Sequence, residues 1–221
     1  MKGFYILLAV VCVAGGGWLA YSAYKKPATG LGPEEPAPVA AKDGFTGYTM
    51  GSDSARIEVT EYSDFECPFC AAFASVQMPV IRQQLIETGK VRWRYRDYPL
   101  SSHKYSRTAA LAAQCVGEQG KFWQMHDLLF GHHDWAQRDK DPSGLFRTFA
   151  ESTAVNLPQY DACIASRRYA GRIQASLEEG QARAIQGTPS FFVDGRHYEG
   201  HPTSDAFQAL VDSLTAARRK R

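Results

Sequence analysis

The chain has 221 residues and a formal net charge of +2, and 44% of its residues are hydrophobic and 22% charged. These proportions are typical of a globular protein. The nearly balanced charge gives no support to nucleic-acid binding, so we expect no nucleic-acid partner.

Residues 3–24 form an uncharged segment that Lys2 precedes and that Lys25 and Lys26 follow. A helix of about 22 residues is about 33 Å long, which is enough to cross a bilayer. We therefore expect residues 1–26 to be an N-terminal transmembrane segment that acts as an uncleaved signal anchor. The alternative is a cleaved signal peptide, which would leave a soluble protein.

Residues 27–50 are rich in proline, alanine and glycine. Such a composition cannot bury a hydrophobic core and favours a flexible chain. We expect this segment to be a linker between the anchor and a folded domain at residues 51–217.

Residues 56–62, Arg-Ile-Glu-Val-Thr-Glu-Tyr, predict a β-strand. Glu61 is notable because a carboxylate in a mostly apolar strand is costly unless it has a role or a partner. Burial would raise its pKa toward neutrality and suit it to proton transfer. The alternative is a solvated strand end. Asp64 and Glu66 follow in a loop, where we expect them to act as surface charges rather than as catalytic groups.

Cys67-Pro68-Phe69-Cys70 opens a helix predicted over 67–87. Cysteines at i and i+3 can form a disulfide that an outside thiolate attacks. The helix N-terminus stabilises a thiolate, so Cys67 is the expected nucleophile and the more buried Cys70 the resolving thiol. Alternatives are a structural disulfide or half of a zinc site, but no second CxxC or HxxxH follows at finger-like spacing. We expect no metal.

Further elements follow in chain order. Pro79 predicts a kink in the 67–87 helix, because proline removes a hydrogen bond and crowds the preceding turn. Residues 91–96 alternate apolar and basic, which predicts a strand whose arginines lie on a solvated face. Helices are predicted over 105–116, 121–130, 143–152, 158–166, 169–184 and 204–217, and residues 218–221 form a basic tail.

Thr188-Pro189 precedes a predicted hairpin over 190–198 whose turn is Asp194-Gly195. A proline that opens a strand must lie where no backbone donor is needed. Because a cis bond costs little before proline, we expect Thr188-Pro189 to be cis. The alternative is an ordinary trans turn.

Two stretches together resemble DsbA-like thiol–disulfide oxidoreductases. Residues 61–70, EYSDFECPFC, resemble the active-site stretch of that family, and residues 187–195, GTPSFFVDG, resemble its cis-proline loop and the following strand. The resemblance runs from about residue 51 to residue 216. It implies an α/β protein with a thioredoxin fold and an inserted α-helical domain at about 103–184.

The resemblance also implies roles. In this family an acid at the position of Glu61 relays the proton of the resolving thiol, here Cys70. The loop at Pro189 lies against the cysteine pair, and its backbone receives substrate. The expected substrate contacts around the pair are Pro68, Phe69 and Thr188. Strongly oxidising relatives carry histidine where this chain has Phe69, so Cys67 should be less acidic than in those relatives.

Cys115 and Cys163 both fall within the expected helical insertion. Two remaining thiols in one subdomain suggest a structural disulfide, which suits an oxidising compartment. The alternative is a pair of buried, unpaired cysteines. His132 and His133 are adjacent, so they would not share a helix face, and we interpret them as surface polar residues rather than metal ligands.

The sequence therefore predicts a membrane-anchored thiol–disulfide oxidoreductase, a monomer on the periplasmic side of the cytoplasmic membrane. It would introduce disulfides into reduced or unfolded client proteins through the Cys67–Cys70 couple, without another cofactor. A quinone-linked membrane partner would reoxidise it. A reductase or isomerase is the alternative within the same chemistry. A thioredoxin-like chaperone or a metal-handling module is the alternative from another class.

Overall fold

The computed structural model describes residues 31–34, 41–200 and 202–219. The expected anchor at residues 1–26 lies outside this part of the chain. Among the described residues, no helix is both long and apolar enough to cross a membrane.

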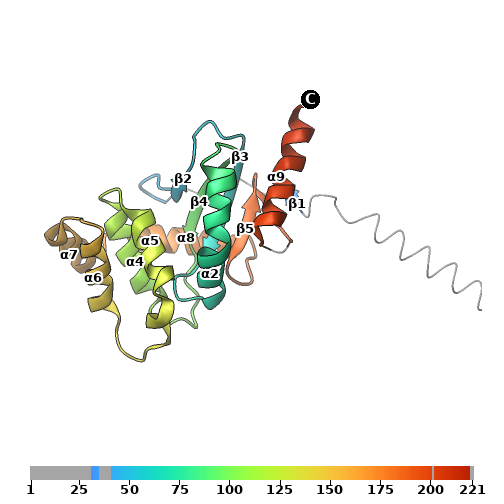
Figure 1. Ribbon diagram of the computed structural model, residues 1–221. Helices are drawn as coiled ribbons and strands as arrows, with labels where there is room; N and C mark the ends of the chain where they lie inside the picture. The colour runs from blue at the N-terminus through green and yellow to red at the C-terminus, as the bar shows by residue number, and fades with distance from the viewer. Residues whose placement is uncertain (1–30, 35–40, 201, 220–221) are drawn as a thin grey trace, which may run out of the picture.

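The centre of the fold is a mixed six-stranded sheet with the strand order β1-β6-β5-β3-β4-β2 (Figure 1). The central strand β3 pairs in parallel with β4 and antiparallel with β5. The strands are β1 (Leu31–Glu34), β2 (Tyr48–Met50), β3 (Ile57–Ser63), β4 (Val91–Asp97), β5 (Ser190–Val193) and β6 (Arg196–Tyr198). Together with the helices between β4 and β5, this arrangement confirms the expected thioredoxin fold with a helical insertion.

Both edge strands lie within residues 27–50, which we expected to be a flexible linker. Strand β1 pairs with β6, and Leu31 is only 2% exposed. Strand β2 pairs with β4, and the ring of Tyr48 stacks on Phe122 at 3.8 Å. Strands this short show almost no periodicity, and their partners lie far away in the sequence. A composition rich in proline, alanine and glycine therefore hides them.

The helix that carries the cysteines continues from Pro68 to Ile86, but it changes type. Its segments are α2 (Pro68–Ala72), the π-helical η1 (Phe73–Gln77), α3 (Met78–Ile81) and the π-helical η2 (Arg82–Ile86). Pro79 cannot donate to the carbonyl four residues earlier and would clash with it. The wider turn of η1, in which the Met78 N–H donates to the Phe73 carbonyl, relieves this conflict. The disturbance expected at Pro79 is thus a π turn.

The insertion packs its helices beside the sheet, with α4 to α7 grouped on one side in Figure 1. A disulfide joins Cys115 to Cys163 and so ties α4 to α7. The remaining helices are α4 (Ser106–Gly117), α5 (Phe122–Gly131), the short 3-10 helix η3 (His133–Gln137), α6 (Ser143–Ser152), α7 (Leu157–Ser166), α8 (Ala170–Ala182) and α9 (Ser204–Arg219). Most ends lie within two residues of the predicted ones, whereas η3 was not predicted.

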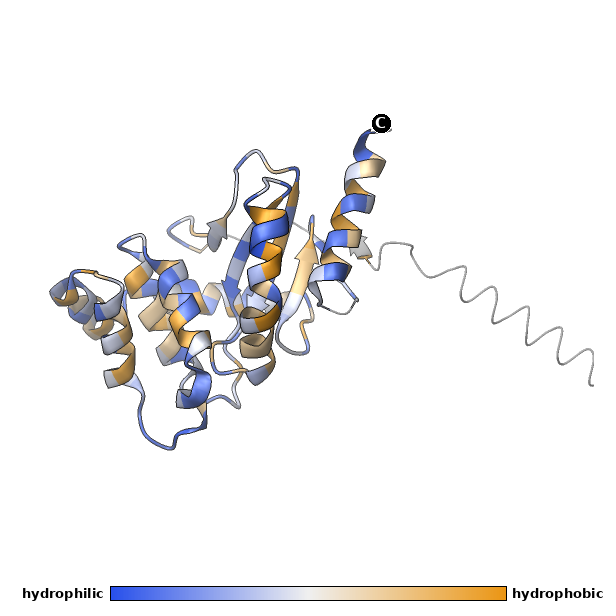
Figure 2. Ribbon diagram, viewed as in Figure 1, coloured by the Kyte–Doolittle hydropathy of each residue, from blue (hydrophilic) through white to orange (hydrophobic). Residues whose placement is uncertain are grey.

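The two faces of the sheet are covered by different helices. Alternation along β3 places Glu61 and Ser63 on the same face as Tyr95 of β4, and the cysteine helix and α9 cover this face (Figure 1). The apolar residues of this helix and of α9 lie on one stripe each, as the alternating colours of Figure 2 show. Tyr62 points to the opposite face, toward α8.

We expected the arginines of β4 to lie on a solvated face, but two of the three, Arg94 and Arg96, are buried. Arg94 is 8% exposed and Arg96 is 1% exposed. Arg94 binds the Glu58 carboxylate at 2.8 and 2.9 Å, and Arg96 binds Glu179 of α8. The alternating sequence of β4 predicts one polar face. It does not predict that this face is covered, because the covering helix α8 lies far away in the sequence.

Candidate active site

Cys67 lies at the start of the cysteine helix. Its backbone is extended, its N–H donates to the Asp64 carbonyl at 3.0 Å, and its carbonyl accepts from the Ala71 N–H at 3.1 Å. Pro68 occupies the first turn, where its missing N–H costs nothing. Cys70 follows within the first turn and is completely buried.

The two thiols have opposite pKa shifts. The pKa of Cys67 is lowered to about 5, first by a hydrogen bond from the Cys70 thiol and then by the Thr188 hydroxyl and the backbone N–H groups of Cys70 and Phe69, against the effect of burial. Burial and the neighbouring Cys67 raise the pKa of Cys70 well above its ordinary value. At neutral pH, Cys67 is therefore a thiolate and Cys70 a thiol, as a nucleophile and its resolving partner require.

The loop before β5 lies against Cys67. The Thr188-Pro189 bond is cis, and the Cys67 thiol donates to the Thr188 carbonyl at 3.4 Å. Ser190 then pairs with Tyr62 of β3, so the loop is held next to the central strand. The structure thus brings the two motifs together, although about 120 residues separate them in the sequence.

Glu61 is buried on the sheet face below the cysteine helix. Its side chain accepts a hydrogen bond from the Trp93 indole at 2.9 Å, and the residue is 1% exposed. Burial raises the pKa of Glu61, while His126, Trp93 and Ser63 act in the opposite direction. The expected buried acid is present, and it is shifted toward the neutral form.

Other buried polar groups surround this acid. Burial first, and then the charges of Asp97, Glu61, Cys70 and Asp64, raise the pKa of Tyr95. Burial also raises the pKa of Asp97 to about 6, against a hydrogen bond from Gln114 at 2.8 Å. Three titratable groups, Glu61, Tyr95 and Asp97, are therefore buried on the same face of the sheet, next to the cysteine pair.

Asp64 is a fixed part of the site and not the surface charge that we expected. It is 1% exposed. Its carboxylate accepts hydrogen bonds from the Leu100 N–H at 2.8 Å and the Ser106 hydroxyl at 2.5 Å, and it lies 2.7 Å from His103 Nδ1. These bonds fasten the loop before Cys67 to the start of α4.

His133 is a neighbour of the cysteines that sequence reasoning missed. Partial burial lowers its pKa, whereas the backbone of Phe65 and Glu66 and the charge at Cys67 act in the opposite direction. His133 is therefore a partly buried residue that senses the charge of Cys67, and not the exposed surface residue that we expected. Its irregular 3-10 segment has no sequence periodicity that could have indicated this position.

Apolar surface is exposed beside the nucleophile. Phe69 is 74% exposed and Val76, two turns further along the helix, is 63% exposed. Large apolar side chains this open to water are unusual on a folded surface and often mark contact sites. Within residues 31–34, 41–200 and 202–219, no three histidine, cysteine or acidic side chains are grouped so as to hold a metal ion.

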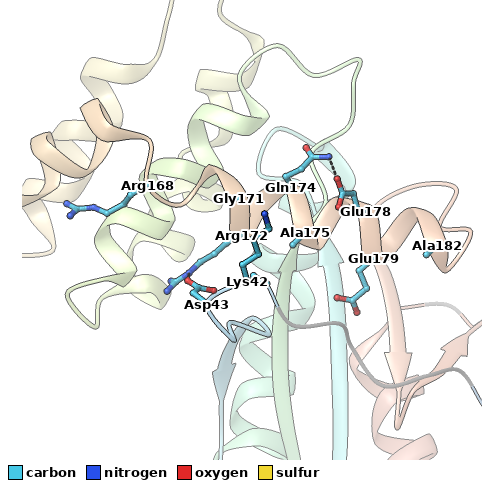
Figure 3. A pocket seen from close by; sticks show the side chains of 11 residues that line it. Lys42, Asp43, Arg168, Gly171, Arg172, Gln174, Ala175, Glu178, Glu179 and Ala182 are labelled. Carbon is cyan, nitrogen blue, oxygen red and sulfur yellow. Dashed lines mark hydrogen bonds and ion pairs between the residues drawn. The ribbon is translucent and has the colours of Figure 1, made fainter.

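A pocket of about 810 Å³ lies elsewhere, between α8 and the segment that follows residue 40 (Figure 3). Arg172 binds Asp43 at 2.5 Å, and Gln174 binds Glu178 at 2.9 Å. Because these polar groups of the wall are already paired and no cysteine lines the pocket, Cys67 and not this pocket is the centre of the candidate active site.

Residues 44–213 match the thioredoxin family. The chain belongs to this family. It is 38% identical over 175 residues to the Na(+)/H(+) antiporter NhaA 3 of Salinispora tropica, a match that covers 79% of this chain and 26% of that protein. The chain thus spans about a quarter of the length of the first curated relatives it matches. It is 26% identical over 166 residues to disulfide bond formation protein D of Bacillus subtilis, with 74% of each chain covered.

The solved structure of oxidised BdbD from Bacillus subtilis superimposes on this member of the thioredoxin family with a TM-score of 0.70 at 24% identity. The match covers 82% of this chain and 98% of that one. The resemblance to DsbA-like oxidoreductases seen in the sequence is therefore confirmed at the level of family and fold.

Proposed function

We propose that this protein is a thiol–disulfide oxidoreductase that introduces disulfides into reduced or unfolded client proteins. The opposite pKa shifts of Cys67 and Cys70 carry the proposal. A thiolate that is stable at neutral pH favours the reduced form of the pair and so makes its disulfide oxidising. The name of the Bacillus subtilis relative, disulfide bond formation protein D, supports the same direction.

The chemistry is two successive thiol–disulfide exchanges. A client thiolate attacks the Cys67 sulfur of the oxidised pair, so a client–Cys67 bond forms and the Cys67–Cys70 bond breaks. Cys70 leaves as a thiolate and takes a proton from Glu61. A second client thiolate then attacks the client sulfur of the mixed disulfide and releases Cys67 as a thiolate. The client loses two electrons and the cysteine pair gains them.

The exposed surface around Cys67 suits an unfolded client. Phe69 and Pro68 offer apolar contact, and the backbone of the loop at Thr188 and Pro189 can pair with an extended peptide as a further strand. This mode of binding reads backbone rather than sequence, as an enzyme with many clients requires.

Reoxidation, compartment and assembly belong to the same proposal. A membrane partner of the quinone-linked type would accept the electrons, and no further cofactor is needed. The Cys115–Cys163 disulfide supports a location outside the cytoplasm, where such bonds persist. We propose that a segment within residues 1–26 anchors the protein, as a monomer, on the periplasmic side of the membrane. The antiporter activity named for the longer relatives is not assigned here, because the match covers a quarter of them.

The reduction potential of the pair tests the direction. We expect equilibration with glutathione to give a potential well above that of thioredoxin, about −270 mV. Oxidised protein should also oxidise a reduced, unfolded client, and Cys67→Ala should abolish this. A potential at or below the thioredoxin value would favour the reductase alternative instead.

A further inference from the structure

The proton that Glu61 exchanges with Cys70 needs a route to water. Glu61 lies in the central strand and is 1% exposed, and Cys70 is completely buried. Each redox cycle adds one proton to Cys70 and removes one again. A buried acid can repeat this only if it exchanges protons with solvent through neighbouring groups.

Helix α5 places His126 beside this region. The imidazole ring lies 5.3 Å from the ring of Tyr95 and almost perpendicular to it, and Tyr95 is the register neighbour of Glu61 on β4. Among the groups that act against the raised pKa of Glu61, the charge of His126 is the largest. The ring packs among five aromatic side chains: Phe65, Tyr95, Phe122, Trp123 and Phe130.

The two nitrogens of this ring face different surroundings. Nδ1 lies 2.8 Å from an Asp127 carboxylate oxygen, and the Asp127 side chain is 46% exposed at the surface, where Arg82 binds it at 3.0 and 3.1 Å. Nε2 is buried, and no group in the described part of the chain lies at hydrogen-bond distance from it. The residue itself is 1% exposed, so the imidazole bridges the interior and the surface.

Further buried polar atoms lie unpaired on the same face. They are Ser63 Oγ, Tyr95 Oη and Asp97 Oδ1, each without a hydrogen-bond partner among the described residues. Leaving a buried polar atom unpaired costs about 1–3 kcal/mol, so several of them in one region need an explanation. Polar interiors of this kind commonly hold bound water, which can conduct protons between side chains that do not touch.

We propose that His126 carries protons between Glu61 and solvent, with Asp127 at the outer end of the route. When an oxidising partner's disulfide renews the pair, Cys70 gives its proton to Glu61 and attacks the Cys67–partner disulfide, and the partner thiolate leaves. Glu61 passes the proton to Nε2, directly or through water, and His126 releases its Nδ1 proton toward Asp127 and solvent. When a client is oxidised, protons travel inward along the same route.

This inference rests on the proposed function, and a pH profile will report every titratable group near the route. The titratable and charged groups around Glu61 and His126 are Cys70 of α2, Tyr95 and Asp97 of β4, Asp127 of α5 and Arg82 of η2. Cys67 lies just before α2, beside Cys70. Asp97 is the rival outlet, because it is buried, lies on the same face and titrates at about 6. It therefore provides the matched control.

The test uses the full chain and the variant His126→Phe, which fills the aromatic cage without a titratable nitrogen. Stopped-flow mixing of reduced protein with oxidised glutathione would follow formation of the Cys67–Cys70 disulfide together with proton release to an indicator dye. We expect His126→Phe to slow the step that uses Cys70 by roughly 10- to 100-fold near neutral pH. The ultraviolet titration of the Cys67 thiolate should not change.

Coupling to Glu61 separates a relay from a packing effect. If protons pass from Glu61 to His126, the double variant Glu61→Gln, His126→Phe should be no slower than Glu61→Gln alone. The control Phe130→Leu should keep the wild-type pH profile. Asp97→Asn should remove only the titration near pH 6 and should leave the rate of the Cys70 step at neutral pH unchanged. Should His126→Phe fail to fold, Asp127→Asn leaves the core intact and should still slow proton release, by a smaller factor.

The outcomes separate this inference from the proposed function. Superimposable profiles for wild type and His126→Phe, or slowing that multiplies in the double variant, would overturn the relay while wild-type exchange remained normal. Loss of the Cys70 step in Asp97→Asn would move the outlet to Asp97 and overturn it as well. A wild-type protein that exchanges no disulfides with glutathione would instead refute the proposed function itself.

Discussion

Each face of the central sheet buries one glutamate, and the two glutamates have different hydrogen-bonding and charged partners. Glu179, on the α8 face, binds the guanidinium groups of Arg96 and Arg183 and accepts from the Tyr62 hydroxyl. Glu61, on the face of the cysteines, accepts from the neutral indole of Trp93. One carboxylate is neutralised by fixed cations, and the other is left with its charge poorly compensated.

This difference separates structural support from chemistry. A buried ion is costly, and pairing it with fixed cations offsets that cost while holding it in one charge state. A buried acid without such a partner keeps a raised pKa and can change its protonation state. One face of the sheet thus fastens α8 to β4, whereas the other buries an acid that can change its protonation state, as the proposed proton transfer with Cys70 requires.

Removing the paired glutamate should have the largest effect on stability. Glu179→Ala leaves Arg96, whose side chain is completely buried, without this carboxylate, so we expect a loss of about 3–5 kcal/mol in the free energy of unfolding. Urea unfolding of the oxidised protein measures it. The pH profile of disulfide exchange should keep its shape, because the cysteines lie on the other face.

Glu179→Gln is the matched control, because it keeps the size of the side chain and a hydrogen-bond acceptor for Tyr62. Its loss should be smaller than that of Glu179→Ala. A cost below about 1 kcal/mol for the alanine variant, as is typical of exposed pairs, would mean that the cluster is not a structural clamp.

Replacing Glu61 should raise the free energy of unfolding, whereas replacing Glu179 should lower it. Burial raises the pKa of Glu61 in the folded state above the unfolded value of about 4.3. The stability due to the bound proton is therefore fully present below about pH 4 and is lost as the pH rises through the folded pKa. Glu61→Gln does not titrate, so we expect it to be more stable than wild type by about 2 kcal/mol once the wild-type acid ionises.

Urea unfolding of both proteins as oxidised disulfides, across a range of pH, measures this difference. Oxidation removes the titration of the thiols, and the contribution of Asp97 is common to both proteins and cancels. A difference that does not change with pH would show that Glu61 keeps its ordinary pKa, and the contrast between the two faces would then disappear.

The sequence predicted the cysteine pair, the buried acid and the strands that carry them, because these features are local. Cys67 and Cys70 lie three residues apart at the start of a helix, and Glu61 stands out as an acid among apolar residues. Figure 1 shows how this segment, β3 followed by the cysteine helix, forms the centre of the fold.

What remained hidden depends on contacts between distant residues. The sequence predicts that Arg96 is solvated, because its partner Glu179 on α8 lies 83 positions away. His126 resembled an ordinary helix residue, since only the packing of α5 beside β4 brings it to the ring of Tyr95. The edge strands were missed for the same reason, because β1 is a strand only through its pairing with β6.

The smallest predicted effect is on the pKa of Cys67, which uncharged hydrogen-bond donors, among them the Thr188 hydroxyl, help to lower. Thr188→Val removes the Thr188 hydroxyl, which helps to lower the pKa of Cys67. If uncharged groups set the acidity of Cys67, this variant should raise the pKa of Cys67, and each pH unit of increase corresponds to about 1.4 kcal/mol. Thr188→Ser keeps the hydroxyl and should titrate like wild type. Absorbance of the thiolate at about 240 nm, followed from acid to neutral pH in the reduced protein, gives both values. Equal titrations for the valine and serine variants would leave the Cys70 thiol and the helix N–H groups as the source of the acidity, and the loop would then contribute to substrate binding alone.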